Sequence, residues 1–352
     1  MPYDSLLVVS FGGPEGPDDV IPFLENVLRG RNVPRERMLE VAEHYQHFGG
    51  VSPINAQNRA LIAALRPELD AHGIDLPIYF GNRNWRPFLP DTLAEMKRDG
   101  RKHALAFVTS GQSSYSGCRQ YRENIIAAQA AVGDAAPQID KLRVFYNHPD
   151  YIAAQLERIH EQLSKFDPAD RDKVHLLCTA HSIPMSMANS SDYVKQLTET
   201  TRLLTELLGF TADRVQLVYQ SRSGRPEDPW LEPDVKDAMT ALHQMGHNHL
   251  IIAPIGFISD HIEILFDLDE ECVQLAHDLR MTLHRAGTVG THPRFITMIR
   301  KLIQERLDPT APREAIGHYG PNWDMCPINC CPAPQRPARP ITASGERGAS
   351  AP

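Results

Sequence analysis

The chain has 352 residues, and 42% of them are hydrophobic, enough for one large domain or two ordinary ones. Its formal net charge of −8 argues against a general nucleic-acid binder, which would hold phosphates through clustered cations. The longest apolar run, near residues 250–258, is far shorter than the roughly 20 residues that cross a bilayer. Composition therefore favours small-molecule chemistry with no nucleic acid and no membrane span. Because no secretory signal is visible, we expect a cytoplasmic protein.

Short apolar runs alternate with amphipathic stretches along the chain, as in parallel strands connected by helices. The fold class is therefore α/β, with helices filling most of the gaps between strands. In chain order, we expect strands at residues 5–10, 78–80, 104–109, 144–146, 174–180, 215–219 and 250–254.

The order of these parts repeats once. Residues 90–96 (PDTLAEM) precede the third strand and residues 233–239 (PDVKDAM) precede the last, and the two heptads share Pro, Asp and Met. Proline followed by an acidic residue is also typical of helix starts in general, so the agreement has a second explanation. A duplication predicts two similar halves whose strand carboxyl ends face a shared cleft.

Strand-ending residues such as Asn147-His148-Pro149-Asp150 and changes in composition predict where the chain divides. We expect an N-terminal half at 1–147, a C-terminal half at 148–293, a helix at 294–307, a cysteine-containing extension at 308–331 and a tail at 332–352. The tail is rich in Pro, Ala, Gly and Ser without periodicity, which predicts disorder.

The first strand runs into Phe11-Gly12-Gly13-Pro14-Glu15-Gly16. Its spacing fits neither a dinucleotide-binding nor a Walker loop, Pro14 removes a backbone donor, and Glu15 would repel a phosphate. We therefore expect no nucleotide cofactor. A glycine turn that lets the backbone approach a partner, such as a flat ligand, fits better.

A histidine and three carboxylates are candidates for chemistry. His181 directly follows a strand, where α/β enzymes hold catalytic groups, although a structural or exposed histidine is the alternative. Glu263, Asp267 and Glu271 are spaced four residues apart in a helical segment and so share one face. That face is either a solvated acidic surface or a track for divalent cations or protons. In the second case, His181 and Glu263 could meet across one cleft.

Two segments could contact an anionic ligand. Arg29 and Arg31 flank a glycine, and the loop at 49–53 offers the Ser52 hydroxyl together with backbone donors. A surface turn with solvated arginines explains the same spacing.

Cysteines cluster near the C-terminus, where Cys326, Cys330 and Cys331 fall within six residues. A disulfide framework is not expected in a reducing cytosol, so the cluster either ligates a metal or has no such role. Cys178 and Cys272 lie in apolar contexts that are typical of core thiols.

Several motifs together resemble the ferrochelatase family, most closely its coproporphyrin ferrochelatases of Gram-positive, actinobacterial type. The similarity extends over about residues 3–305, and the motifs HSIP and DHIE are its most specific parts. In chain order the motifs are SFGGP (10–14), GGVSPI (49–54), TAHSIP (179–184), QSR (220–222), DPWL (228–231) and GFISDHIE (256–263).

The resemblance implies a chelatase-like fold, with two Rossmann-like halves whose four-stranded parallel sheets are flanked by helices. It also implies a lyase of haem and porphyrin biosynthesis that inserts ferrous iron into coproporphyrin III. The products are coprohaem and two protons, Fe²⁺ is a substrate, and the enzyme that next processes coprohaem is a further partner. A neutral imidazole beside the macrocycle can accept pyrrole protons, and carboxylates can supply exchangeable metal ligands.

By their places in the motifs, His181 and Glu263 are the implied metal-binding and catalytic pair, and Asp267 and Glu271 continue the metal path. Phe11 stands where some relatives have a tyrosine that ligates the product iron, which phenylalanine cannot do. The implied porphyrin contacts are Ser52, Tyr121, Phe11, Arg29 and Arg31.

Some members of this type also carry a 2Fe-2S cluster on C-terminal cysteines. Four thiolates are needed, and Cys118 completes the set with Cys326, Cys330 and Cys331. Adjacent ligands at 330 and 331 are geometrically awkward, so zinc binding and a metal-free tail stay open.

Three other functions remain open: a protoporphyrin IX ferrochelatase, a cobalt or nickel chelatase for another tetrapyrrole, and a non-catalytic porphyrin or haem carrier. A carrier needs an axial ligand for its product, which Phe11 does not provide. An enzyme needs a proton acceptor and a metal path, which His181 and the Glu263 line offer. The choice of coproporphyrin rests on the resemblance alone.

Overall fold

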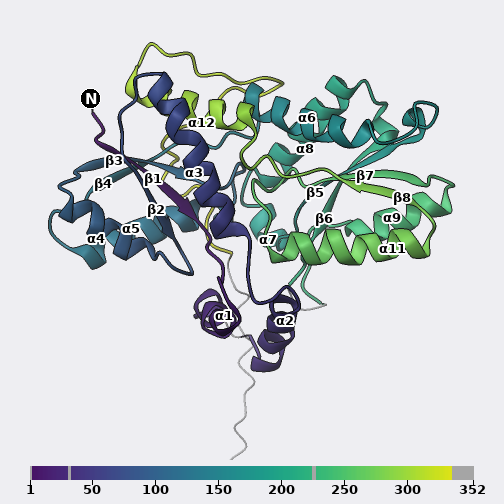
Figure 1. The fold of residues 1–352 in the computed structure, drawn as a ribbon, viewed down its shortest axis with the longest axis horizontal. Helices are drawn as coiled ribbons and strands as arrows, with labels where there is room; N and C mark the ends of the chain where they lie inside the picture. The colour runs from purple at the N-terminus through teal and green to yellow at the C-terminus, as the bar shows by residue number, and fades with distance from the viewer. Residues whose placement is uncertain (1, 31–32, 224–226, 335–352) are drawn as a thin grey trace, which may run out of the picture.

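The structure, a computed structural model, describes residues 2–30, 33–223 and 227–334. Two four-stranded parallel sheets lie side by side, each flanked by helices (Figure 1). The strand order is β2-β1-β3-β4 in the first sheet and β6-β5-β7-β8 in the second, so the second half repeats the first strand for strand. The predicted α/β class and the two Rossmann-like halves are confirmed.

The central strands of both sheets are almost wholly buried, because helices cover both of their faces. This is why they read as continuous apolar runs in the sequence. The strands are β1 (Ser5–Ser10), β2 (Ile78–Asn82), β3 (His103–Val108), β4 (Gln138–Lys141), β5 (His175–His181), β6 (Val215–Gln220), β7 (His249–Ala253) and β8 (Thr282–Arg285).

At least one helix separates each pair of consecutive strands, as a parallel sheet requires. Those of the first half are α1 (Val20–Leu28), α2 (Arg35–His47), α3 (Ile54–Ala71), α4 (Leu89–Arg98) and α5 (Gln120–Val132). The later helices are α6 (Pro149–Leu163), α7 (Met185–Ala188), α8 (Tyr193–Leu208), α9 (Val235–Gln244), α10 (Ile262–Ile264), α11 (Cys272–Asp278) and α12 (Pro293–Leu307). Helices α1 and α2 lie below the junction of the two halves in Figure 1.

Six of the eight strands are predicted correctly, including the edge strands β2 and β6. Residues 144–146 form no strand: Val144 and Tyr146 are buried beside Cys118, and Phe145 is buried in the main core, as the chain turns toward α6. The other two edge strands, β4 and β8, were not predicted. Each pairs with only one neighbour and is only partly buried, so it carries polar residues and lacks the apolar run that marks a central strand.

The two heptads of the sequence repeat do not superpose as aligned. Phe88 pairs in a parallel bridge with Asn82 and precedes α4, and Asp234 pairs in the same way with Tyr219 and precedes α9. Position 88 is therefore equivalent to position 234. The sequence repeat had aligned position 90 with position 233, so the two alignments differ by three residues. The shared Pro-Asp reflects helix-start chemistry, although the strand order does repeat.

Helix α12 holds the halves together because it packs against α3 of the first and α6 of the second. Beside it, the Arg143 guanidinium makes a bidentate ion pair with Glu305, with both N–O distances 2.8 Å and both side chains at most 2% exposed. Helix α12 begins at Pro293, one residue before the predicted start.

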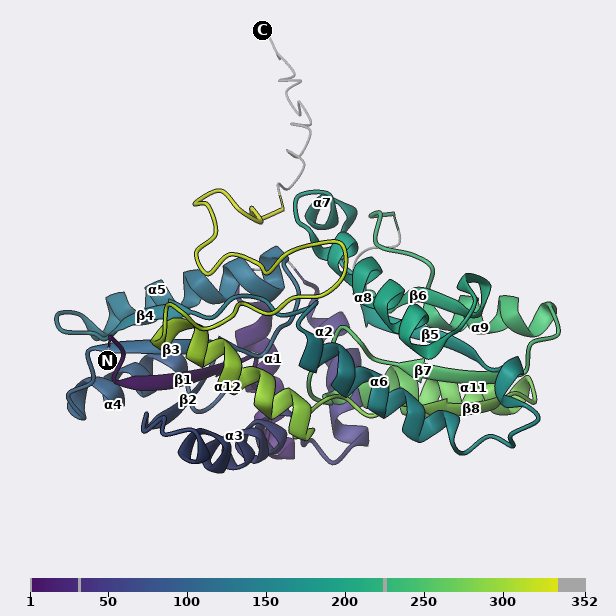
Figure 2. The ribbon, with the colours of Figure 1, turned by 90° about the horizontal axis from the view of Figure 1, so that it is seen from above.

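The chain after α12 crosses the junction of the halves (Figure 2). The backbone N–H of Ile316 donates to the Asn147 carbonyl, and the Asn147 side chain donates to the Tyr319 carbonyl. The backbone N–H of His318 donates to Glu199 on α8. The predicted boundary at Asn147, between β4 and α6, and the other segment limits stay predictions. Most of the predicted disordered tail, residues 335–352, lies outside the described residues.

In the described part of the chain, no helix is both long and apolar enough to span a bilayer.

Candidate active site

The three predicted carboxylates lie on one segment that follows β7. Helix α10 continues directly into a π-helical stretch, Leu265–Glu271, and then into α11. The predicted helix is therefore confirmed, with a wider π-helical middle of the kind often found at functional sites. Ile264, Leu268 and Cys272 are fully buried at the same spacing of four, in contact with the core around β7 and α9. This apolar stripe packs the segment against the core. Each of its residues is directly preceded by one of the three carboxylates, which therefore lie outside the apolar core.

His181 is the last residue of β5, and its ring is fixed by the backbone. Its Nδ1 lies 2.5 Å from the Ser182 carbonyl, which can only accept, so Nδ1 carries the proton. The lone pair of the neutral ring is therefore on Nε2, which lies 3.6 Å from Glu263 Oε2. The Tyr193 hydroxyl donates to the His181 carbonyl and holds the end of the strand. His181 is thus prepared to accept a proton or to ligate a metal through Nε2.

A second histidine, His261, approaches the same carboxylate oxygen. Its Nδ1 lies 3.6 Å from Glu263 Oε2. Burial lowers the pKa of His261, although the negative charge of Glu263 opposes this effect. The His261 ring is therefore neutral near neutral pH. Two imidazoles, of which burial keeps His261 neutral, therefore converge on one carboxylate. His261 was not among the site residues predicted from the sequence. Its position two residues before Glu263 in the DHIE motif could have indicated that it lies near the same site.

Asp267 and Glu271 continue the line of carboxylates that begins at Glu263, whose own side chain is 46% exposed. Asp267 accepts hydrogen bonds from the Ser221 hydroxyl and, at 3.4 Å, from the Gln220 amide. Burial, reinforced by the charges of Glu263 and Glu271, raises the pKa of Asp267 to about 6. Glu271 pairs with the Lys236 ammonium at 2.8 Å. Glu271 and Lys236 line an open surface groove of about 660 Å³. The carboxylate line therefore connects the two histidines at Glu263 with the groove at Glu271 through the more buried Asp267.

The first half of the molecule closes on this segment through α2 and α3. His47 Nε2 lies 2.5 Å from Glu270 Oε1, and the His44 ring stacks on Phe266 at 3.8 Å. The Gln57 side chain on α3 accepts a hydrogen bond from the backbone N–H of Asp260 at 2.8 Å. The site therefore lies where elements of both halves meet.

Tyr45, also on α2, lies close enough to sense Glu263. Burial, with the negative charge of Glu263, raises the pKa of the Tyr45 phenol well above its usual range. The phenol therefore stays protonated. Nothing in the sequence marked the contacts of α2, because its pattern is that of an ordinary amphipathic helix.

Two of the predicted porphyrin contacts share one partner. The Arg83 guanidinium lies 5.5 Å from the centroid of the Phe11 ring and 4.6 Å from that of Tyr121. Arg83 also donates to the Ser116 carbonyl in the π-helical segment Tyr115–Arg119, which leads into α5. Tyr121 is only 4% exposed, whereas Phe11 is half-buried.

The other predicted contacts are more scattered. Ser52 is buried against the glycine turn, and a Cβ added at Gly13 would lie 2.6 Å from the Ser52 Cβ. The Gly12-Gly13 turn therefore serves a close approach within the protein itself. Arg29, at the end of α1, is exposed and donates to Asn26. Arg31 lies outside the described residues.

The four cysteines predicted to act together lie in contacting pairs, but among the described residues no three of their sulfur atoms lie within 4.8 Å of one another. Cys330 Sγ lies 3.4 Å from Cys331 Sγ, and the Cys326 thiol donates to Cys118. The Lys141 ammonium lies 3.0 Å from Cys118 Sγ. The neighbouring Cys326 thiol and the Lys141 cation lower the pKa of Cys118 against the effect of burial, which favours the thiolate form of this sulfur.

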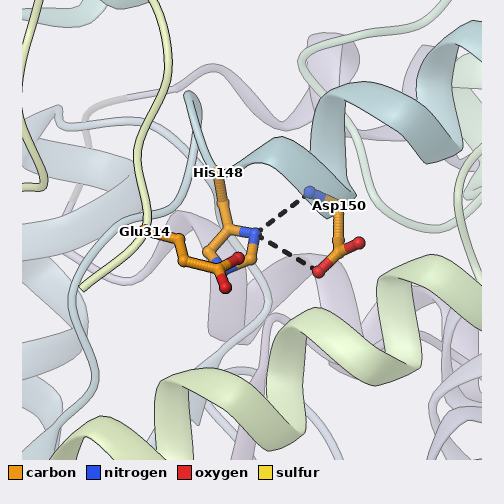
Figure 3. A group of neighbouring side chains, drawn as sticks. All are labelled: His148, Asp150 and Glu314. Carbon is orange, nitrogen blue, oxygen red and sulfur yellow. Dashed lines mark hydrogen bonds and ion pairs between the residues drawn. The ribbon is translucent and has the colours of Figure 1, made fainter. Parts of the chain in front are cut away.

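Figure 3 shows another group of potential ligands, His148, Asp150 and Glu314, at the crossing of the C-terminal extension. His148 Nδ1 accepts from the Asp150 backbone N–H, and Nε2 lies 3.8 Å from Glu314. The Lys301 ammonium lies 2.8 Å from both carboxylates and so takes the place of a cation. The group is an internal ion cluster that ties the extension to α6 and α12, rather than a metal centre.

Comparisons with known proteins agree with this arrangement. A family model described as Ferrochelatase matches residues 3–307. A ferrochelatase from Rhodopirellula baltica is 56% identical over 97% of this chain and 99% of its own length. A coproporphyrin III ferrochelatase from Nocardia farcinica is 49% identical over 96% and 99%.

Among solved structures, SirB from Bacillus subtilis with Fe³⁺ superposes with a TM-score of 0.53 at 15% identity, over 86% of this chain and 95% of that chain. This likeness concerns the fold. The family model and both relatives span nearly the whole chain, including the paired histidines and the carboxylate line. The chain therefore belongs to the ferrochelatase family, as the resemblance of its motifs predicted.

Proposed function

We propose that this metal chelatase inserts Fe²⁺ into coproporphyrin III, forming coprohaem with release of two protons. The observation that carries the proposal is the convergence of the His181 Nε2 lone pair, His261 and Glu263 at the start of a carboxylate line. The names of several relatives, coproporphyrin III ferrochelatases, support the choice of substrate. Coprohaem would then pass to the enzyme that processes it next.

His181 is the proposed base. Its Nε2 takes a pyrrole proton, and the Ser182 carbonyl, which accepts from Nδ1, stabilises the imidazolium that forms. Glu263, 3.6 Å away, further stabilises that cation and can receive its proton. No electron is transferred, because iron enters as Fe²⁺ and two protons leave.

The carboxylate line can serve both protons and metal. Asp267 changes charge near neutral pH because its pKa is about 6, so it can receive a proton from Glu263 and release it toward Glu271. In their ionised forms, Glu271, Asp267 and Glu263 are exchangeable oxygen ligands for incoming Fe²⁺. Lys236, paired with Glu271, reduces the negative charge at the outer end and limits how strongly a metal is held there.

The porphyrin is proposed to lie against the half-buried Phe11, with the buried Tyr121 and Ser52 supporting that surface from behind and with Arg29 and Arg31 toward its propionates. Phe11 offers an aromatic face but no ligand atom. The product iron is therefore not held by a side chain at position 11, which favours release over storage.

An anaerobic assay tests the proposal. Purified protein is mixed with Fe²⁺ and either coproporphyrin III or protoporphyrin IX, and the loss of porphyrin fluorescence is followed against a reaction without enzyme. We expect catalytic loss with coproporphyrin alone. A preference for protoporphyrin would overturn the substrate but not the chemistry. Tight binding of either porphyrin without turnover would indicate a carrier.

We also propose that Cys118, Cys326, Cys330 and Cys331 hold a 2Fe-2S cluster. Their four sulfur atoms are the donor type that such a cluster uses, and the Lys141 ammonium, 3.0 Å from Cys118 Sγ, favours a thiolate there. The cluster would add redox chemistry that iron insertion does not need. Free clustered thiols also suit a reducing compartment, which supports a cytoplasmic location.

The cluster proposal is tested by absorption and metal analysis. Protein purified without oxygen should absorb visible light, and Cys330→Ser should abolish that absorption, whereas Cys178→Ser, at a buried cysteine in the core, should not. Zinc in place of iron, or no bound metal, would refute the cluster.

A further inference from the structure

Arg285, the last residue of β8, attaches two points of the active-site segment to the edge of the second sheet. Its Nε and Nη2 lie 2.5 and 2.8 Å from the two oxygens of Asp269, a bidentate pair. Its Nη1 lies 3.3 Å from Asp260 Oδ1. The guanidinium is only 17% exposed, so solvent screens these contacts weakly.

The two carboxylates that Arg285 holds bracket the reacting groups. Asp260 immediately precedes His261, and Asp269 lies within the π-helical stretch that carries Asp267. Glu263 lies between them. An arginine at this place therefore fixes both ends of the segment whose middle must meet His181.

A π-helical stretch needs such support. Its i→i+5 hydrogen bonds are less favourable than those of an α-helix, so the stretch persists only where tertiary contacts favour it. The buried stripe of Ile264 and Leu268 gives one set of contacts, and Arg285 gives another. Asp260 is also held from the first half, since its backbone N–H donates to Gln57.

We propose that Arg285 is a positioning residue for iron insertion, holding Asp260 and Asp269 so that Glu263 faces His181 Nε2. Its guanidinium donates to Asp260, Asp269 and the Ala286 carbonyl, so it would act through these carboxylates. The inference rests on the proposed roles of His181 and Glu263. The planar guanidinium binds both carboxylate oxygens of Asp269 and one oxygen of Asp260. A lysine ammonium cannot make all three contacts in this geometry, so Arg285→Lys should retain only part of the metallation activity.

The test compares Arg285→Met and Arg285→Lys with Arg294→Met. Arg294 makes a similar short pair with Glu157, but this pair joins α12 to α6 at an exposed place. Asp269→Asn provides a second way to weaken the attachment while leaving β8 unchanged. For each variant, amide hydrogen exchange, porphyrin affinity and metallation kinetics are measured.

For Arg285→Met we expect faster exchange confined to residues 260–271, a fall in kcat of about 10- to 100-fold, and porphyrin affinity within about twofold of the wild type. Arg285→Lys and Asp269→Asn should be intermediate, and Arg294→Met unchanged. Wild-type kcat with unaltered exchange in Arg285→Met would overturn the inference. Faster exchange throughout β5–β8, together with weaker porphyrin binding, would also overturn it by showing a general structural role.

Failure of the proposed function gives a different result. A wild-type protein that metallates neither porphyrin would refute the function, whereas the exchange pattern of residues 260–271 would still decide what Arg285 holds.

Discussion

His148 offers a quantitative test of how the C-terminal extension is attached. It is fully buried and caps α6 by accepting the Asp150 backbone N–H. Burial, with the Arg143 and Lys301 cations, lowers the pKa of His148 to about 3 from 6.5, although Asp150 opposes this. The folded protein therefore holds a neutral imidazole where the unfolded chain binds a proton in mild acid.

The sign and size of the effect follow from that difference. As the pH falls below 6.5, the His148 imidazole binds a proton in the unfolded chain but not in the folded protein. The free energy of unfolding therefore decreases. Between pH 7.5 and pH 5 the loss is about 2 kcal/mol, and it approaches about 5 kcal/mol only near the folded pKa of about 3.

His148→Asn should remove this dependence while keeping a side-chain cap for α6. We expect the wild type to lose about 2 kcal/mol more than the variant between pH 7.5 and pH 5, measured by urea unfolding. His277→Asn, at a highly exposed histidine, is the control and should retain the wild-type slope. Equal slopes for the wild type and His148→Asn would refute the reasoning.

Three further predictions concern the site and the core. His181→Ala should abolish metallation while porphyrin affinity, from fluorescence titration, changes little; near-normal turnover would remove His181 from the mechanism. Glu305→Gln leaves the Arg143 cation buried and should cost about 3–5 kcal/mol of unfolding free energy, and a loss below 1 kcal/mol would show that water reaches the pair. Gly13→Ala would force a Cβ to 2.6 Å from the Ser52 Cβ, so we expect about 1–3 kcal/mol of destabilisation and weaker porphyrin binding. A fully stable, tight-binding variant would show that the turn can shift.

The sequence predicted the central strands and two of the four edge strands, and missed the two polar edge strands. Central strands such as β1 and β5 are covered on both faces, so their residues must be apolar and the pattern is visible without any partner. The edge strands β4 and β8 have one partner each and tolerate polar residues, so no local pattern marks them. Residues 144–146 show the converse: they are apolar because Val144 and Tyr146 are buried beside Cys118 and Phe145 is buried in the main core, not because they form a strand.

The sequence by itself determined the class of fold, the family motifs and the order of the chemical groups along the chain. His181 after a strand and the spacing of Glu263, Asp267 and Glu271 are local features, set by strand ends and helical periodicity. They require no knowledge of distant contacts.

Only the tertiary structure decided which groups meet and in what protonation state. The Ser182 carbonyl fixes the lone pair of His181, burial keeps His261 neutral and raises the pKa of Asp267, and Arg285 reaches the site from an edge strand that the sequence did not reveal. These properties depend on distances between residues remote in the chain and on exclusion of water. Both arise only when the two halves and the helices between them have packed.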